Sequence, residues 1–530
     1  MNDMAMKDLA MKDLAMKDLA TNPYDAVAYP GHAFSQTHPA HLATIAHIHG
    51  MNPAPTATMR VLELGCGSGG NLIPMALQCA GARLVGIDLS GRAIARAKAE
   101  AAELGLSNVS FEQRDIMAVT AELGQFDYIL VHGVYSWVPQ PVRERIMALF
   151  GELLAPQGIA YVSYNALPGC RLRDIARDVM LFETRDIDDP IEKVRVARAA
   201  IKRFAEATDA ETFHGAALRE RAKQIEDIPD NVLYHDDLNP GARAFALHEV
   251  LAAAEPHGLQ FLAETSFPNN FGGARGPAQQ VLNAIPISEP LRQEQALDLL
   301  IGRCFRQTLL CRAGITLHRG LADFSFAPYH LAANVQEEVD KVDEKRPGAA
   351  SFLFADGVRL AVDLPAAKAA LRALGRTWPG NIRYDELVAL ALQEAGAGSD
   401  REHEVERLNE ALTAIYRAGL IEIAVEPHRL ATRISERPVA SLLARRQALA
   451  SHEVTDLRHR AVALDGVVVR KFVSLLDGTR TPAMLLDELN AFLAEAHASG
   501  RGGPALPKQA TAAEVDMHLR DVARLALLAG

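Results

Sequence analysis

The sequence predicts an α/β fold for the first half of the chain, followed by a largely helical second half. Two observations indicate the α/β class. Strand-like and helix-like segments alternate between residues 59 and 104, and a glycine-rich turn joins the first strand to the first helix. A third observation concerns the second half, where from about residue 320 charged, turn-rich linkers separate helices from short strands.

The alternating segments can be assigned one by one. "RVLEL" is a short apolar run that predicts a buried strand, "GCGSGG" is the turn and "NLIPMALQCA" is the helix. "RLVGIDL" is the next strand, and "SGRAIARAKAEAAELG" is an amphipathic helix with Ser90 as its N-cap. Two strands joined by a helix predict a parallel pair with a right-handed crossover.

The turn and the second strand carry the features of a nucleotide-type site. Gly65, Gly67 and Gly69 let a ligand approach the backbone without a Cβ in the way. Asp88 ends the second strand, 19 residues after Gly69, and an acid at that place hydrogen-bonds ribose hydroxyls. Turn and acid together predict a nucleoside cofactor, although the turn alone also fits a dinucleotide fold.

Glu63, within "LELGCGSG", extends this pattern, and the stretch resembles motif I of class I S-adenosylmethionine (SAM) methyltransferases. "NVSFEQRDIMAV", "FDYILVHGVYSWVP" and "LLAPQGIAYVSYN" follow in the order of that family. The resemblance implies a Rossmann-like, seven-stranded methyltransferase sheet and SAM as cofactor. It also implies the cofactor-binding residues Glu63, Gly65, Gly67, Gly69, Asp88, Leu89, Asp115, Ile116 and His132, with Asp115 and Ile116 beside the adenine.

A narrower likeness covers nearly the whole chain after residue 20. "FSQTHPAHLA", "HGVYSWVP" and "AYVSYNALPG" resemble bacterial protein-lysine methyltransferases that modify outer-membrane proteins, and "GARAFALHEV" and "CFRQTLLCR" resemble their appended regulatory region. The likeness implies that "LQFLAET" and "FRQTLLCR" are the sixth and seventh strands. It also implies that Gln36 and Thr37, with Tyr29 and His38, close over the cofactor, although His38 fits a structural cap equally well.

"VHGVYSWVP", residues 131–139, follows the fourth strand and should face the reacting methyl group. If the acceptor is lysine, its pKa of about 10.4 must fall before transfer. An apolar, aromatic channel disfavours the ammonium and attracts cations through ring faces. Tyr135 and Trp137 are therefore predicted to line the acceptor channel, a role that both rings can share only if the segment is extended.

Other roles for this loop remain open at the sequence level. Trp137 fits a core position, and Tyr135 fits a cap on the helix "PVRERIMALFGELLA". His132 could relay a proton or hold the loop through a hydrogen bond. Asn165, with Tyr164, follows the fifth strand and is a further candidate catalytic residue.

Composition excludes several classes of protein. A net charge of −11 argues against a general nucleic-acid binder, and no apolar run approaches the roughly 18–20 residues of a membrane helix. The five cysteines are scattered without a CxxC pair, which favours a reducing, cytoplasmic location. The eighteen histidines show no metal-ligand spacing, so no metal is expected.

The chain is expected to divide into five segments. Residues 1–20 are a disordered repeat tail of "MKDLA" units, 21–185 the SAM-binding core, and 186–318 a helical insertion and regulatory region that completes the sheet. A middle α+β, winged-helix-like domain covers 319–435, and a C-terminal winged-helix-like domain covers 436–530. "RDIDDPIEKVRVARAAIKRFAEA" in the insertion fits either a scaffold helix or a substrate lid.

Smaller features of the second half can also be predicted. "FLFADGVRLAV" predicts a hairpin with Asp356-Gly357 in a type I′ turn, and Trp378 should lie in the core. Because the segment from about residue 431 lacks a basic helix face, protein docking, dimerisation or a structural role fits it better than DNA binding. A homodimer is one option for the oligomeric state.

These patterns predict SAM-dependent methyl transfer to a protein substrate, at the lysine side-chain amine. By resemblance, the substrate is an outer-membrane or surface protein. Two alternatives stay open: a methyltransferase acting on a small molecule or another protein residue, and a non-catalytic SAM-binding scaffold.

Overall fold

The computed structural model describes residues 31–267, 276–286, 288–319, 324–342, 348–396, 400–428, 430–431, 433–499 and 506–529. The predicted repeat tail lies outside the described residues. The chain divides into two compact units, of which unit 1 is Met1–Gly31 with Ile45–Gly320, and unit 2 is His32–Thr44 with Leu321–Gly530.

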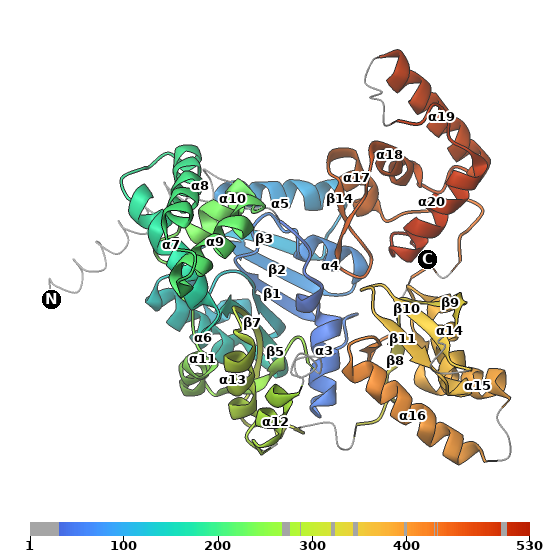
Figure 1. The fold of residues 1–530 in the computed structure, drawn as a ribbon, viewed down its shortest axis with the longest axis horizontal. Coiled ribbons are helices and arrows are strands. Elements are labelled where there is room, and N and C mark those ends of the chain that lie inside the picture. Colours follow the sequence, from blue (N-terminus) through green and yellow to red (C-terminus); the bar gives the residue numbers. More distant parts are fainter. Residues whose placement is uncertain are drawn as a thin grey trace. The chain divides into compact units, whose positions relative to one another are not determined.

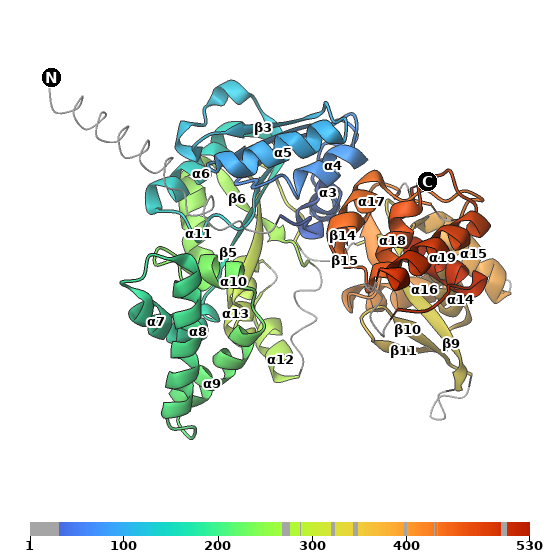
Figure 2. The same cartoon turned by 90° about the horizontal axis from the view of Figure 1, so that it is seen from above.

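A seven-stranded sheet forms the centre of unit 1 (Figures 1 and 2). Its strands are β1 Arg60–Leu64, β2 Arg83–Asp88, β3 Val109–Gln113, β4 Phe126–Val131, β5 Leu154–Asn165, β6 Leu259–Glu264 and β7 Phe305–Arg312, in the order β3-β2-β1-β4-β5-β7-β6. The first five strands run parallel, and β7 is antiparallel to β5 and β6. The predicted methyltransferase sheet, including the sixth and seventh strands, is confirmed.

Helices link the strands of the sheet. They are α4 Leu72–Gln78, α5 Gly91–Glu103, α6 Gln140–Leu153 and α11 Leu247–Ala254, with short turns η2 Ile116–Ala118, η3 Ala121–Leu123 and η5 Glu255–His257. The Ser90 side chain accepts a hydrogen bond from the Ala93 N–H, which confirms the predicted N-cap of α5. α6 and α11 bury apolar side chains together with β4 and β5 in one core, so the carboxyl ends of these strands are held rigidly.

The insertion after β5 folds as a group of three helices, α7 Cys170–Thr184, α8 Pro190–Ala207 and α9 Phe213–Glu226 (Figures 1 and 2). They enclose a small core that contains Met180, Ile201 and Leu218. α10 Asp230–Val232 and η4 Leu233–Asp237 return the chain toward the sheet. Because α8 contributes buried residues to this core, its packing favours a scaffold helix over a separate lid.

α12 Pro277–Asn283 and α13 Pro290–Ile301 lie between β6 and β7 in the sequence. Arg306 on β7 is fully buried and forms ion pairs with Glu264, Glu294 and Asp298, at N–O distances of 2.6 to 2.9 Å. A buried guanidinium needs such partners, because it would otherwise lose its hydration without replacement. This cluster fixes β6 and α13 against β7.

Unit 2 begins, after its N-terminal segment, with small sheets and helices. The elements are β8 His330–Ala332, β9 Val335–Val342, β10 Ala350–Phe354, β11 Arg359–Val362, α14 Pro365–Thr377, β12 Ile382–Arg383, α15 Tyr384–Ala395, α16 Arg401–Arg417 and β13 Glu422–Ala424. β10 and β11 form the predicted hairpin. The predicted turn type is wrong, because Gly357 has a positive φ of 83° but Asp356 does not, and a type I′ turn requires both.

The end of unit 2 comprises α17 Leu442–Ala450, β14 Glu453–Thr455, β15 Ala461–Ala463, α18 Val467–Leu475, α19 Pro482–Ala498 and α20 Ala512–Arg524, around their own core. Trp378 is buried, as predicted, and its indole N–H donates to the Arg524 carbonyl at 2.9 Å. The N-terminal residues η1 Ser35–Thr37 and the start of α3 Pro39–Ile48 belong to this unit, where Thr44 accepts a hydrogen bond from Val425. In the described part of the chain, every helix is too short or too polar to cross a membrane.

Candidate functional site

The glycine turn after β1 is fastened to the end of β2. Gly65, Gly67 and Gly69 have φ values of 83°, 52° and 79°, which L side chains rarely adopt. The Gly65 N–H donates to the Ile87 carbonyl at 2.7 Å, and the Gly67 N–H donates to the Asp88 carboxylate at 2.8 Å. The sequence spacing of turn and acid therefore reflects a direct contact between them.

The three glycines are required for different reasons. A Cβ on Gly65 would collide with Val134 of the loop after β4, and a Cβ on Gly69 would lie 2.8 Å from the Phe111 ring. A Cβ on Gly67 would meet no heavy atom within 4 Å. Gly65 thus admits the neighbouring loop, whereas Gly67 faces open space in which a ligand could contact the backbone.

Two carboxylates flank this turn. Asp88 accepts hydrogen bonds from the backbone N–H groups of Gly67 and Ser90, both at 2.8 Å, so it organises the turn. Glu63 is buried and accepts from the Asn71 side chain at 2.8 Å, but its Oε2 has no partner among the described residues. Burial raises the pKa of Glu63 to about 7, with a smaller contribution from the charge of Asp88.

An unpaired buried acceptor is unfavourable unless a ligand supplies a donor. SAM carries an ammonium group and ribose hydroxyls, which are the donors that Glu63 and Asp88 would accept. Gly67, which faces this open space, lies between the two acids in the sequence, and its N–H donates to Asp88. The residues present therefore fit SAM.

The remaining cofactor candidates follow the neighbouring strands. Leu89 directly follows β2 and is half-buried. Asp115 and Ile116, after β3, are half-buried as well, and Asp115 caps η2 by accepting from the Met117 N–H at 2.9 Å. The structure therefore places these residues at the carboxyl edge of the parallel strands, where open α/β sheets bind ligands.

His132 follows β4 in a half-buried position. Its Nδ1 lies 2.8 Å from the Tyr161 hydroxyl, and the adjacent Gly133 N–H donates to Ser163 Oγ at 2.8 Å. Burial lowers the pKa of His132 to about 4, so the ring is neutral at pH 7. Of the two roles considered for His132, the hydrogen bond observed here corresponds to holding the loop.

The aromatic segment Tyr135–Trp137 forms a turn, in which the Trp137 N–H donates to the Val134 carbonyl at 2.8 Å. The extended conformation required for both rings to share one wall is absent. Tyr135 is 3% exposed, with its ring 5.2 Å from that of Phe245 and 6.2 Å from that of Tyr164. Tyr135 thus lies in the core instead of at a channel mouth, whereas Trp137, for which a core position was considered, is half-buried.

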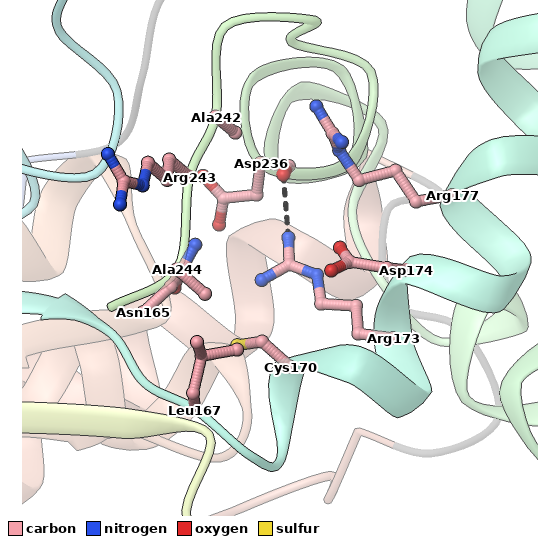
Figure 3. A pocket seen from close by; sticks show the side chains of 10 residues that line it. All are labelled: Asn165, Leu167, Cys170, Arg173, Asp174, Arg177, Asp236, Ala242, Arg243 and Ala244. Carbon is pink, nitrogen blue, oxygen red and sulfur yellow. Dashed lines mark hydrogen bonds between the residues drawn. The ribbon is translucent and has the colours of Figure 1, made fainter. Parts of the chain in front are cut away.

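Asn165 ends β5 and connects three parts of the site. Its N–H donates to Ser136 Oγ at 2.8 Å, and its carbonyl accepts from the Phe245 N–H at 2.9 Å. Its side chain lines a cavity of about 220 Å³ (Figure 3). The other lining residues are Leu167, Cys170, Arg173, Asp174, Arg177, Asp236, Ala242, Arg243 and Ala244.

The sequence did not reveal the importance of the stretch around Phe245. Its backbone extends the edge of β5 through hydrogen bonds with Asn165 and Leu167, and the Arg243 N–H donates to the Ser136 carbonyl at 2.9 Å. The only signal was the resemblance of "GARAFALHEV" to a regulatory region, which carries no contact information.

Gln36 and Thr37 belong to unit 2, so their predicted role at the cofactor stays a prediction. Thr37 is buried and donates to the Phe34 carbonyl at 2.8 Å. His38 accepts from the Ala40 N–H at 3.2 Å and caps the start of α3, which is the structural alternative considered for it. Tyr29 lies outside the described residues.

Three family models match successive parts of the chain. They are a methyltransferase domain over residues 55–200, a predicted methyltransferase regulatory domain over 229–312, and a PKMT C-terminal winged helix domain over 436–527. The structure of PKMT2 from Rickettsia typhi is 26% identical, with a TM-score of 0.82, and the match covers 95% of this chain and 100% of that protein. The chain is a SAM-dependent methyltransferase whose domains are similar to those of PKMT proteins.

The chain is also similar to two proteins of Rickettsia prowazekii. An uncharacterized protein of Rickettsia prowazekii is 29% identical over 452 residues, which is 84% of this chain and 81% of that protein. A second one is 32% identical over 240 residues, 45% of this chain and 96% of its own length. PKMT2 has also been solved in complex with AdoHcy, at 25% identity and a TM-score of 0.82 over 95% of this chain and 100% of that protein. The interpretation as a non-catalytic scaffold is set aside, because the chain is an enzyme.

No three His, Cys, Asp or Glu side chains of the described ranges are arranged to hold a metal ion.

Proposed function

We propose that the methyltransferase transfers the methyl group of SAM to the side-chain amine of a lysine in a protein acceptor. The observation that carries this proposal is the likeness to PKMT2, because PKMT abbreviates protein lysine methyltransferase and the likeness covers 95% of the chain. The C-terminal winged helix domain of the same family supports it further. An outer-membrane or surface protein as acceptor, a homodimer and a cytoplasmic location remain parts of the proposal that rest on the sequence.

The chemistry defines what the chain must supply. SAM, when bound, provides a methyl group on a positively charged sulfur. The acceptor amine must first lose a proton; its nitrogen then forms a bond to the methyl carbon, while the electron pair of the carbon–sulfur bond returns to sulfur. The released proton passes to solvent. The chain has to align the two partners and desolvate the amine, because a buried amine ionises less readily.

The described residues fit these tasks. Gly67, Asp88 and Glu63 offer the backbone surface and the acceptors that hold a nucleoside and an ammonium. The hydrogen bonds of His132 and Gly133 hold the loop after β4 in place. A neutral His132 adds no positive charge that would repel the sulfonium or the acceptor.

Labelled-methyl incorporation tests whether the acceptor is a protein. Full-length enzyme is incubated with methyl-labelled SAM and a cell-envelope extract, which is then divided into protein and small-molecule fractions. We expect the label in the protein fraction with the wild type and little with Asp88→Ala. Label confined to small molecules would refute a protein acceptor.

A further inference from the structure

The cavity beside Asn165 lies at the carboxyl end of β5. Asn165 is at the carboxyl end of β5, and its backbone is bonded to Ser136 in the loop after β4. At about 220 Å³ the cavity is smaller than the roughly 300–1,000 Å³ of pockets that hold drug-sized ligands. Its size fits one amino-acid side chain better than a complete small-molecule substrate.

The arginines at this cavity are already bound to acceptors. Arg173 donates to the buried Asp237 at 2.8 Å and to the Asp236 carbonyl at 2.7 Å. Arg243 pairs with Glu249 at 2.8 Å, and Figure 3 shows its side chain directed away from the other lining groups. Arg177 donates to the carbonyl of Asn239. Carboxylates therefore compensate the charges of Arg173 and Arg243, whereas the hydrogen-bond partner of Arg177 is a neutral carbonyl.

Two acceptors are left for a ligand. The Asp174 carboxylate accepts no hydrogen bond and forms no close ion pair among the described residues, and Figure 3 shows it directed toward Arg173 at the cavity. The Asn165 amide oxygen likewise has no partner there. Burial is the main cause that raises the pKa of Asp174, and the charges of Arg177 and Arg173 oppose this rise. A ligand rich in donors therefore complements the cavity better than a carboxylate does.

We propose that this cavity is the acceptor pocket, in which Asp174 and Asn165 hold the ammonium of the lysine side chain before it is deprotonated. The pocket rests on the proposed function, since it names where that acceptor binds. Asp174 is thus a binding residue for the acceptor and has no part in holding SAM.

A binding experiment tests the pocket without requiring turnover. The probe is Nα-acetyl-lysine N-methylamide, added to the full-length protein with saturating S-adenosylhomocysteine and observed by ligand-detected NMR. We expect Asp174→Asn to weaken probe binding roughly tenfold, because a charge-assisted hydrogen bond is lost. Asp178→Asn, exposed one turn later on α7, is the matched control and should bind as the wild type does. The norleucine counterpart, which lacks the ammonium, should bind weakly to all three proteins.

Equal binding of the lysine probe to the wild type and Asp174→Asn would overturn the pocket, and so would preferential binding of Nα-acetyl-aspartate N-methylamide. A kinetic readout separates this outcome from failure of the proposed function. With envelope protein as acceptor, Asp174→Asn should raise KM for the acceptor while SAM affinity stays unchanged. Absence of lysine methylation by the wild type would refute the proposed function, whereas unchanged kinetics of Asp174→Asn on a methylated lysine would refute the pocket alone.

Discussion

Two carboxylates 25 residues apart show how similar side chains acquire different roles at this site. Asp88 accepts two backbone hydrogen bonds, which favour its charged form. Glu63 is buried with one unpaired oxygen, and its pKa is raised to about 7. Spacing predicted Asp88 as a cofactor residue, and the resemblance to motif I predicted Glu63. Their electrostatic difference depends on burial and partners that neither signal encodes.

Asp88→Ala is expected to weaken SAM binding by about 1–3 kcal/mol. The substitution removes the acceptor of the Gly67 N–H as well as the expected partner of the ribose. Titration calorimetry measures the SAM dissociation constant, with Asp178→Ala on the exposed face of α7 as the control. An unchanged constant in a folded Asp88→Ala variant would remove Asp88 from the cofactor site.

Glu63 should make the stability of the unliganded protein depend on pH. Its pKa is about 7 in the folded protein against 4.5 as the ordinary value, so the folded state favours the protonated form. Its contribution to the free energy of unfolding is therefore largest below pH 4.5 and is lost as pH rises to about 7. We expect the stability of the wild type relative to Glu63→Gln to fall over this range by a few kcal/mol, on the order of 1.4 kcal/mol per unit of pKa shift. Urea denaturation at several pH values measures it, and a constant difference between the two proteins would contradict a protonated Glu63.

At the level of elements, the sequence predicts the strands and helices of unit 1 well, because their apolar periodicity and turn residues are local signals. The position of Tyr135 could not be predicted in the same way. It depends on Phe245, which is 110 residues later in the chain, and on a turn that directs the Tyr135 ring toward it. The cavity at Asn165 likewise combines β5, α7 and the stretch before α11, which no local pattern brings together.

The aromatic loop predicts a clear order of stability effects. Tyr135→Ala should lower the free energy of unfolding by about 3–5 kcal/mol, because it empties a buried site between two rings. Trp137→Ala should cost clearly less, since the ring is half-buried. Urea denaturation of both variants measures the difference. A larger loss for Trp137→Ala than for Tyr135→Ala would show that the roles of the two rings are reversed.

The glycine turn and the loop after β4 are predicted to depend on each other. Gly65→Ala introduces a side chain both at a positive φ and against Val134, whereas Gly105→Ala introduces one at a positive φ of 67° with open space around it. Backbone strain should lower the free energy of unfolding of both variants by about 1–2 kcal/mol. The collision with Val134 should lower that of Gly65→Ala by a further amount of about 1–3 kcal/mol. Thermal unfolding measures the stability of both variants. Equal losses of stability would mean that the Val134 side chain moves aside without a cost in free energy.

At the scale of the whole molecule, the expected division into five segments differs from the two compact units of the structure. The winged-helix-like end of the chain was predicted from the order of its helices and strands, and the family model at residues 436–527 matches it. The inclusion of residues 32–44 in unit 2 was not predicted, because only tertiary contacts, such as the Val425–Thr44 hydrogen bond, connect that segment to the later chain.

The regulatory region contacts the loop after β4 directly within unit 1. Arg243 and Phe245, from residues matched by the regulatory model, hydrogen-bond to Ser136 and Asn165. Residues of the methyltransferase sheet, the insertion and the regulatory region therefore lie together at the carboxyl end of β5.

The identity of the methylated residue tests the central claim most directly. The measurement is tandem mass spectrometry of envelope protein after incubation with the wild-type enzyme and methyl-labelled SAM, with Asp88→Ala as the inactive control. Lysine methylation on the side-chain nitrogen, present with the wild type and strongly reduced with the variant, is the predicted result. Label found only on other residue types, or at equal levels with both enzymes, would contradict a lysine methyltransferase that uses this site.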